Sequence, residues 1–317
     1  MAALKIGVFA PSCPIAGREY RKRLRTVTDY LVSRGFELVI AKNMFMRCGE
    51  CAGNKRTRAA NFNRMVSDPA VDMMMAASGG IGAAEMLDGV DFGLVKKNPK
   101  PIMGLSDTTA LLNGVYAKSG VITYHGPTAC YGIVHYKNPG KIDRKTCREF
   151  RAFLAHGCRT LKPARKYKVL RAGRGEGVLA GGNLDVFSRL IGTPYMPRGN
   201  LILFFEDIGV KLNDIIRIFC QLRDSGTLRR TKGIVLGRFA EITIHGSDPA
   251  IAGEKRIGMA ALEDAIMEQL KGYSFPVLSG AMFGHNVPNT IIPIGAKARI
   301  SGRSVRILDK VRPLSYA

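Results

Sequence analysis

Short apolar runs alternate with segments of helical periodicity along the first half of the chain. The apolar runs predict strands at residues 5–9, 37–41, 72–77, 101–105 and 121–124. Helices are predicted between them at residues 18–34, 56–66 and 108–118. In the first helix, Leu24, Val27 and Leu31 form an apolar stripe at i, i+3 and i+7 spacing. Strands that alternate with helices are typical of a parallel sheet with helices on its faces.

The second half of the chain has a less regular pattern. Residues 156–176 are basic, contain glycine and proline and show little periodicity, which predicts a linker. Beyond it, strands are predicted at residues 177–180, 201–205, 233–236, 297–300 and 305–308. Helices are predicted at residues 184–191, 213–223 and 258–270. The chain is therefore expected to be an α/β protein. Its N-terminal domain (residues 1–155) has a parallel sheet flanked by helices, and a smaller mixed C-terminal α/β domain (residues 177–317) follows the linker.

Three turns that carry serine or glycine follow predicted strands of the first sheet. They contain Ser12, residues 78–82 and Ser106. Ligands of such sheets bind beyond the carboxyl ends of the strands, so all three turns are expected at a site. The glycines within residues 78–82 let the backbone approach a ligand closely, which suits an oxyanion hole or a nucleotide phosphate. The phosphate alternative lacks its usual motifs, since there is no Walker lysine and no G-x-G-x-x-G after the first strand.

The turn around Ser106 is the most informative of the three. The apolar run at residues 102–105 leads into Ser106, and a helical segment begins at Thr108. A serine on a sharp strand-to-helix turn has an exposed hydroxyl close to backbone amides, as in a nucleophile elbow. Thr108 stands where the last glycine of G-x-S-x-G would be. The non-catalytic alternative is that Ser106 or Asp107 caps the following helix.

A serine nucleophile needs a base, which is normally a histidine oriented by a carboxylate. Two of the five histidines are candidates: His285, in a loop flanked by glycine and proline, and His125, which closes a predicted strand. For the carboxylate, an apolar run ends directly at Glu206 and Asp207. Adjacent side chains on a strand point to opposite sides, so only one of these acids is expected to face a site.

The formal net charge of +23 is the most unusual feature of the composition. Such an excess attracts anionic partners through its long-range potential. The basic residues are spread over many segments without zinc-finger spacing or an aromatic RNP pattern, so no specific nucleic-acid partner is expected. No apolar run approaches the roughly 18–20 residues that span a membrane. With no secretory signal pattern at the start, the expectation is a cytoplasmic protein without a membrane partner.

The seven cysteines have irregular spacing and do not predict a disulfide framework. Cys48 and Cys51 form a C-x-x-C, but no second pair and no paired histidines complete a zinc set. The chain is therefore expected to hold no metal.

Several short motifs occur in a telling order along the chain. They are Ala10-Pro-Ser12, Ala52-Gly53, Arg58-Ala59, Asp68-Pro69, Gly79-Gly-Ile-Gly82, Gly104-Leu-Ser-Asp-Thr108, Gly181-Gly-Asn-Leu184, Gly192-Thr-Pro194, Phe205-Glu-Asp207, Phe283-Gly-His285 and Pro293-Ile-Gly295. Each motif is unspecific alone, but the ordered series resembles the muropeptide LD-carboxypeptidase family, which also contains the microcin C immunity peptidases. The likeness extends over about residues 4 to 300.

The resemblance implies a serine carboxypeptidase with a Ser-His-Glu triad drawn from both domains. By motif, Ser106 is the nucleophile, His285 the general base and acid, and Glu206 the partner that orients His285. The family's reaction cleaves the amide between an L-centre and a terminal D-amino acid, typically D-alanine of a muropeptide tetrapeptide in cell-wall recycling. The family needs no metal or organic cofactor.

The same resemblance implies where the substrate lies. The amides of Gly80 and Asp107 are expected to form the oxyanion hole, and Ser78 and Gly79 to contact the substrate. An anionic muropeptide, or another peptide ending in a D-amino acid, is the expected partner, and a homodimer is expected by analogy. Two features depart from the family pattern: Ser78, where many relatives carry an arginine or another residue, and the long stretch at residues 242–256.

Two other functions stay open on the sequence. One keeps the triad but cleaves peptidyl or aminoacyl nucleotides, as the microcin immunity relatives do; the other is a non-catalytic protein that binds polyanions. The immunity relatives stack their nucleotide on an aromatic loop residue, and this chain has no tryptophan. That difference favours muropeptides, although tyrosine or phenylalanine can substitute.

Overall fold

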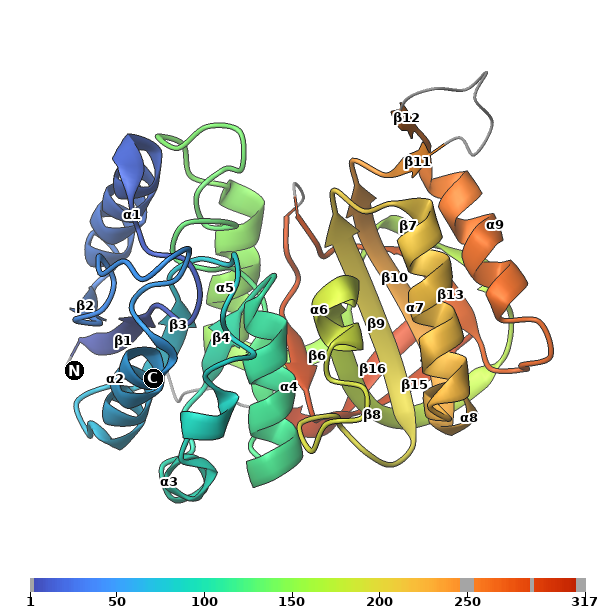
Figure 1. The fold of residues 1–317 in the computed structure, drawn as a ribbon, viewed down its shortest axis with the longest axis horizontal. Coiled ribbons are helices and arrows are strands. Elements are labelled where there is room, and N and C mark those ends of the chain that lie inside the picture. The colour runs from blue at the N-terminus through green and yellow to red at the C-terminus, as the bar shows by residue number, and fades with distance from the viewer. Residues whose placement is uncertain (1–2, 246–253, 286–287, 312–317) are drawn as a thin grey trace.

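The computed structural model describes residues 3–245, 254–285 and 288–311, and its first half is a sheet between helices (Figure 1). The elements of this half are β1 (Leu4–Phe9), α1 (Gly17–Val32), β2 (Phe36–Ile40), α2 (Lys55–Ser67), β3 (Met73–Ala76), the 3₁₀ helix η1 (Leu87–Gly89), α3 (Phe92–Lys97), β4 (Ile102–Gly104), α4 (Thr108–Ser119), β5 (Thr123–His125) and α5 (Arg144–His156). The sheet has the strand order β14-β5-β4-β3-β1-β2, and β1 to β5 all pair in parallel. The predicted α/β architecture of this half is confirmed.

Both faces of this sheet are buried, which is why its strands are apolar throughout instead of alternating with polar residues. On β3, Met74 and Ala76 belong to the apolar cluster formed with α2 and α4. Met73 and Met75 point to the other face and pack in the cluster formed with α1 and α5.

The second half forms an eight-stranded mixed sheet. Its elements are β6 (Cys158–Leu161), β7 (Pro163–Arg171), β8 (Arg174–Asn183), α6 (Leu184–Ser188), β9 (Leu201–Ile208), α7 (Leu212–Asp224), α8 (Thr227–Arg230), β10 (Thr231–Ala240), α9 (Met259–Gln269), β13 (Val277–Ala281), β15 (Lys297–Ser301) and β16 (Ser304–Val311). The strand order is β6-β16-β15-β8-β9-β10-β13-β7. The central strands β8, β9, β10 and β13 are parallel, and the outer strands pair antiparallel.

The segment predicted as a linker, residues 156–176, contains β6, β7 and the first residues of β8, so that prediction is wrong for its structure. β6 and β7 are the two edges of the eight-stranded sheet. Most residues of β7 are exposed or half-buried and many are basic, with Tyr167 its one fully buried residue. Charged residues are common on edge strands, because they discourage pairing with other chains. They also remove the apolar alternation by which a strand is recognised from sequence. The division of the chain into domains at residues 155 and 177 stays a prediction.

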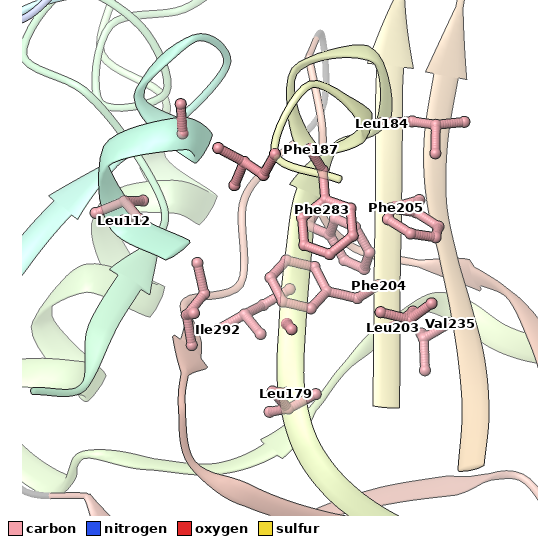
Figure 2. Packing of buried hydrophobic residues seen from close by; sticks show 14 of the residues in the cluster. Leu112, Leu179, Leu184, Phe187, Leu203, Phe204, Phe205, Val235, Phe283 and Ile292 are labelled. Carbon is pink, nitrogen blue, oxygen red and sulfur yellow. The ribbon is translucent and has the colours of Figure 1, made fainter. Parts of the chain in front are cut away.

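The two halves share strands and core. After β13 the chain returns to the first sheet, where β14 (Ile292–Ile294) pairs antiparallel with β5. One apolar cluster includes Leu112 of α4, Phe204 of β9 and Ile292 of β14, all three of which are labelled in Figure 2. The antiparallel β14 was not predicted, since three buried residues are too short a run to stand out as a strand.

Part of the long stretch at residues 242–256 forms a two-stranded ribbon of β11 (Thr243–His245) and β12 (Glu254–Arg256). The rest of it, residues 246–253, lies outside the described residues. Within the described ranges, no helix has both the length and the apolar character needed to cross a membrane.

Candidate active site

Three turns meet at the carboxyl edge of the first sheet, as the sequence predicts, and Asp107 ties them together. Its Oδ2 atom accepts hydrogen bonds from Ser12 Oγ at 2.6 Å, after β1, and from the Ala83 amide at 2.8 Å, after β3. Burial raises the pKa of this carboxyl, although both hydrogen bonds favour its ionised form. Asp107 precedes α4 but makes no side-chain capping bond. The capping alternative is therefore wrong for Asp107, whose side chain joins the three turns instead.

Ser106 lies between β4 and α4 with φ of 64°, one of two non-glycine residues with positive φ in the described chain. A non-glycine residue in this region is strained, and such strain clusters at functional sites. The neighbouring turn leaves room for the serine only because residue 79 is glycine. A Cβ on Gly79 would lie 2.6 Å from Ser106 Cβ and 2.8 Å from its Oγ.

The backbone around Ser106 offers hydrogen-bond donors. Gly80 has φ of +120°, and a Cβ there would lie 2.0 Å from Cys13 Sγ, so only glycine fits. Neither the Gly80 nor the Asp107 amide donates to a protein acceptor within the described ranges. Unpaired amides at a cavity are what an oxyanion hole requires.

Glu206 and His285 form a hydrogen-bonded pair across the second half of the chain. Glu206 lies on β9 and is 0% exposed. Its Oε2 atom is 2.7 Å from His285 Nδ1 and also accepts the His285 backbone amide at 3.1 Å. Gly284 lets the chain before His285 approach Glu206 on β9 closely. Its φ is +126°, and a Cβ at this position would lie 3.1 Å from Glu206 Cβ.

The pair shifts the pKa values of both its members. Burial raises the pKa of Glu206, but the charge and hydrogen bonds of His285 outweigh it, so the net pKa is lowered. Burial lowers the pKa of His285, and the charge and hydrogen bond of Glu206 outweigh that effect and raise it. The carboxylate is therefore ionised and stabilises positive charge on the imidazole.

Asp207, the other acid of the predicted pair, points elsewhere. Its Oδ1 atom accepts from Asn183 Nδ2 at 2.7 Å, and its Oδ2 atom accepts from the Asp185 amide at 3.0 Å. Burial, together with the charge of Glu206, raises the pKa of Asp207 to about 7. Asp207 thus fixes the start of α6, and Glu206 is the acid that contacts His285.

His125, the alternative base, is 0% exposed and does not line the cavity that holds Ser106. Its ring packs edge-on against Phe204 and Phe283, with centroids 5.5 and 5.7 Å away. Because the His125 ring is buried against two phenylalanines, it cannot contact a substrate, which favours His285 as the base.

Ser106 and His285 line one cavity of about 180 Å³. The expected site residues Ser78, Gly79 and Gly80 line it as well, with Tyr20, Leu105, Thr128, Tyr131 and Tyr136. An adjoining cavity of about 170 Å³ shares Leu105, Tyr131, Tyr136 and His285 and adds residues such as His135 and Lys137.

Sequence reasoning missed the tyrosines of this cavity. Arg23 holds the loop that carries Tyr131 and Tyr136: its guanidinium lies 4.5 Å from the Tyr131 ring centroid and donates to the His135 and Tyr136 carbonyls. Arg23 is only 2% exposed and comes from α1, far away in sequence. A buried arginine within an otherwise basic helix gives no local signal of this role.

Cys48 and Cys51 are free thiols, and their backbones form an isolated bridge. Within the described parts of the chain, no group of three or more His, Cys, Asp or Glu residues is arranged to hold a metal ion.

The site has the parts of a serine hydrolase. They are a strained serine on an elbow, unpaired amides beside it and a carboxylate-bound histidine in the same cavity. The family models of the LD-carboxypeptidase N-terminal and C-terminal domains match residues 6–126 and 176–300. The chain belongs to the LD-carboxypeptidase family and is a serine-type carboxypeptidase.

Relatives within the family carry two kinds of name. A probable murein peptide carboxypeptidase of Bacillus subtilis (strain 168) is 31% identical over 300 residues, which cover 93% of this chain and 88% of the relative. The microcin C7 self-immunity protein MccF of Escherichia coli is 30% identical over 320 residues, covering 93% and 90% of the two chains.

Solved structures of both kinds of relative, MccF and a carboxypeptidase, superpose on this chain. MccF in complex with glutamyl sulfamoyl guanosine superposes with a TM-score of 0.83 at 28% identity, covering 98% of both chains. A muramoyltetrapeptide carboxypeptidase from Oxalobacter formigenes superposes with a TM-score of 0.77 at 25% identity, covering 95% of this chain and 98% of the other.

Proposed function

We propose that this protein is an LD-carboxypeptidase that removes the terminal D-alanine from muropeptide tetrapeptides during cell-wall recycling. The observation that carries the proposal is the Glu206–His285 pair, in which His285 lines the same cavity as Ser106 and has its Nδ1 atom occupied by the Glu206 carboxylate. Relatives named murein peptide carboxypeptidase and muramoyltetrapeptide carboxypeptidase support the substrate class.

In the proposed mechanism, Ser106 Oγ attacks the carbonyl carbon of the L-centre. Because His285 Nδ1 donates to Glu206, the Nε2 atom is free to accept the Ser106 proton. The developing oxyanion is stabilised by the amides of Gly80 and Asp107. His285 then donates the proton to the amine of the leaving D-alanine, and the C–N bond breaks. Water, activated by His285, hydrolyses the acyl-enzyme and regenerates Ser106.

The residues that line the cavity and the charge of the protein support a muropeptide as the substrate. Ser78 and Gly79 line it beside Ser106 and contact the substrate backbone. Muropeptides are anionic, so the formal net charge of +23 draws them toward the protein. A cytoplasmic homodimer is the proposed setting, which cell fractionation and light scattering of the purified protein test.

A second candidate is the hydrolysis of peptidyl or aminoacyl nucleotides. Tyr20, Tyr131 and Tyr136 line the cavity, and such rings can stack on a nucleobase in a chain without tryptophan. The related MccF, solved with glutamyl sulfamoyl guanosine, makes this a concrete alternative.

The test is D-alanine release from a muropeptide tetrapeptide, measured for the wild-type protein and for Ser106→Ala. We expect release by the wild type and loss of at least about 10³-fold in the variant, because triad members act as a unit. Unchanged D-alanine release by Ser106→Ala would show that Ser106 is not the nucleophile. Hydrolysis of an aminoacyl sulfamoyl nucleotide, without D-alanine release, would favour the second candidate. Hydrolysis of neither, with salt-sensitive polyanion binding by both proteins, would favour a non-catalytic role.

A further inference from the structure

His125 lies where the segments that carry the three proposed triad residues meet. It closes β5, and its partner in the parallel register is Gly104, the last residue of β4 and two residues before Ser106. Its ring contacts Phe204 and Phe283, and those two rings contact each other with centroids 5.6 Å apart.

Each of these phenylalanines lies two positions before a triad residue. Phe204 and Glu206 share one face of β9, because side chains of a strand alternate in direction. Phe283 leads into His285 through Gly284. His125 therefore touches the neighbours of Glu206 and His285 on one side and borders the Ser106 strand on the other.

The imidazole has no hydrogen-bond partner of its own. Neither Nδ1 nor Nε2 of His125 is paired within the described residues, although both atoms are buried. Glu206 Oε1 is also buried and unpaired there, since both bonds to His285 use Oε2. Unpaired buried polar groups are rare and costly, so a cluster of them calls for a functional explanation.

The two side chains act on each other electrostatically. Burial lowers the pKa of His125 to about 4, and the charge of Glu206 opposes part of that effect. The ring is thus neutral at physiological pH and carries a single N–H. The negative charge of Glu206 favours the tautomer whose N–H faces the carboxylate.

We propose that His125 is a positioning residue, whose neutral N–H dipole acts on Glu206 without a direct hydrogen bond and so holds the carboxylate in the orientation that His285 needs. The Phe204 and Phe283 rings clamp the imidazole. Gly182 makes room for it, since a Cβ at residue 182 would lie 3.2 Å from His125 Nδ1. The inference rests on the proposed function only in assuming that Ser106 is a nucleophile activated by His285.

The experiment uses a fluorophosphonate, which needs an activated serine but no particular peptide. Ser106 Oγ attacks phosphorus, its proton passes to His285, the P–F bond breaks and fluoride leaves. We would measure the rate of Ser106 labelling in the wild type, in His125→Phe and in His125→Asn. The phenylalanine keeps an aromatic ring without a donor, and the asparagine restores one.

Tyr124→Phe is the matched control, because Tyr124 precedes His125 on β5 but points to the opposite face, against Phe153. Thermal unfolding midpoints show whether each variant is folded. The same substitution at His125 is then made in a Glu206→Gln background, so that a double-mutant cycle reports whether His125 acts through Glu206.

We expect His125→Phe to label about tenfold more slowly than the wild type with unchanged reagent affinity, His125→Asn to recover part of the rate, and Tyr124→Phe to match the wild type. In the Glu206→Gln background the His125 substitution should change the rate by less than about twofold. A wild-type labelling rate in His125→Phe, or the same slowing in both backgrounds, would overturn the inference. If His125→Phe does not fold, His125→Leu takes its place in the cycle. An unlabelled wild type, in contrast, would reject the proposed function itself.

Discussion

The protonation of His285 is decided by two opposing influences at the scale of single residues. Burial alone lowers the pKa of an imidazole, and a neighbouring carboxylate raises it. At His285 the charge and hydrogen bond of Glu206 prevail, so its pKa lies above the ordinary value of 6.5. As the proposed general base, His285 works only when deprotonated, so activity is expected to rise as the pH passes through this raised value.

Replacing Glu206 by glutamine removes the charge but keeps the shape of the side chain. Burial is then the main influence left on His285, and its pKa should fall below 6.5. The midpoint of the acidic limb of kcat/KM moves to lower pH in Glu206→Gln, while the plateau rate falls. Titration of the His285 ring by NMR checks the shift directly. An unchanged midpoint would mean that Glu206 does not set the state of the base.

Sequence and structure contributed differently at this scale. The apolar run before Glu206 and Asp207 predicted a carboxylate at the end of a buried strand, and Glu206 is indeed buried beside His285. Local pattern could not choose between the two acids, because the choice depends on Asn183 and Asp185, which occupy Asp207. The resemblance to the family, which rests on motif order, made the choice that side-chain alternation left open.

At the scale of elements, the elbow between β4 and α4 depends on a neighbouring turn. Ser106 is held beside Gly79 so closely that a methyl group has no space, with 2.6 Å from the expected Cβ to Ser106 Cβ. Gly79 does not have positive φ, so alanine is tolerated by the backbone itself. A substitution there displaces the serine without straining its own chain.

Gly79→Ala is therefore expected to lower kcat/KM by about 100-fold or more, since a displacement near 1 Å of a reacting group has costs of that order. The unfolding midpoint should change little. Gly258→Ala is the control, because Gly258 has ordinary φ and no atom within 4 Å of its Cβ position. Full activity in Gly79→Ala would show that Ser106 need not stay where the structure holds it.

Helices and strands were predictable where the apolar periodicity of the sequence is strong. They were missed where a strand carries charged residues instead of alternating apolar ones. The strands β1 to β5 and the helices α1, α2 and α4 follow from apolar patterns, because the sheet is buried on both faces, whereas the short α3 was not predicted. The edge strands β6 and β7 carry charge instead of alternation. Such edges are visible only once their neighbours β16 and β13 are known.

At the scale of the whole molecule, the site depends on contacts between distant parts of the chain. Glu206 and His285 lie 79 positions apart, and the strand after His285 pairs with β5 of the first sheet. The same return of the chain places Ile292 in the core between the halves (Figure 2). No local pattern reports such pairing, which is why the joining of the two sheets could not be predicted from the sequence.

The formal net charge of +23 is also a property of the whole molecule, and its effect is on encounter. A positive surface steers anionic substrates, and salt screens that attraction with a Debye length of about 10 Å at 0.1 M and about 3 Å at 1 M. For a muropeptide with free carboxylates, kcat/KM should fall severalfold between 20 mM and 500 mM salt while kcat stays constant, because the bound state is unaffected by steering. An analogue amidated at its carboxylates other than the terminal one carries less charge and should show a smaller fall. Equal salt dependence of kcat/KM for both substrates would show that the charge serves another partner. A fall in kcat as large as the fall in kcat/KM would show that salt acts on the bound complex and not on the approach of the substrate.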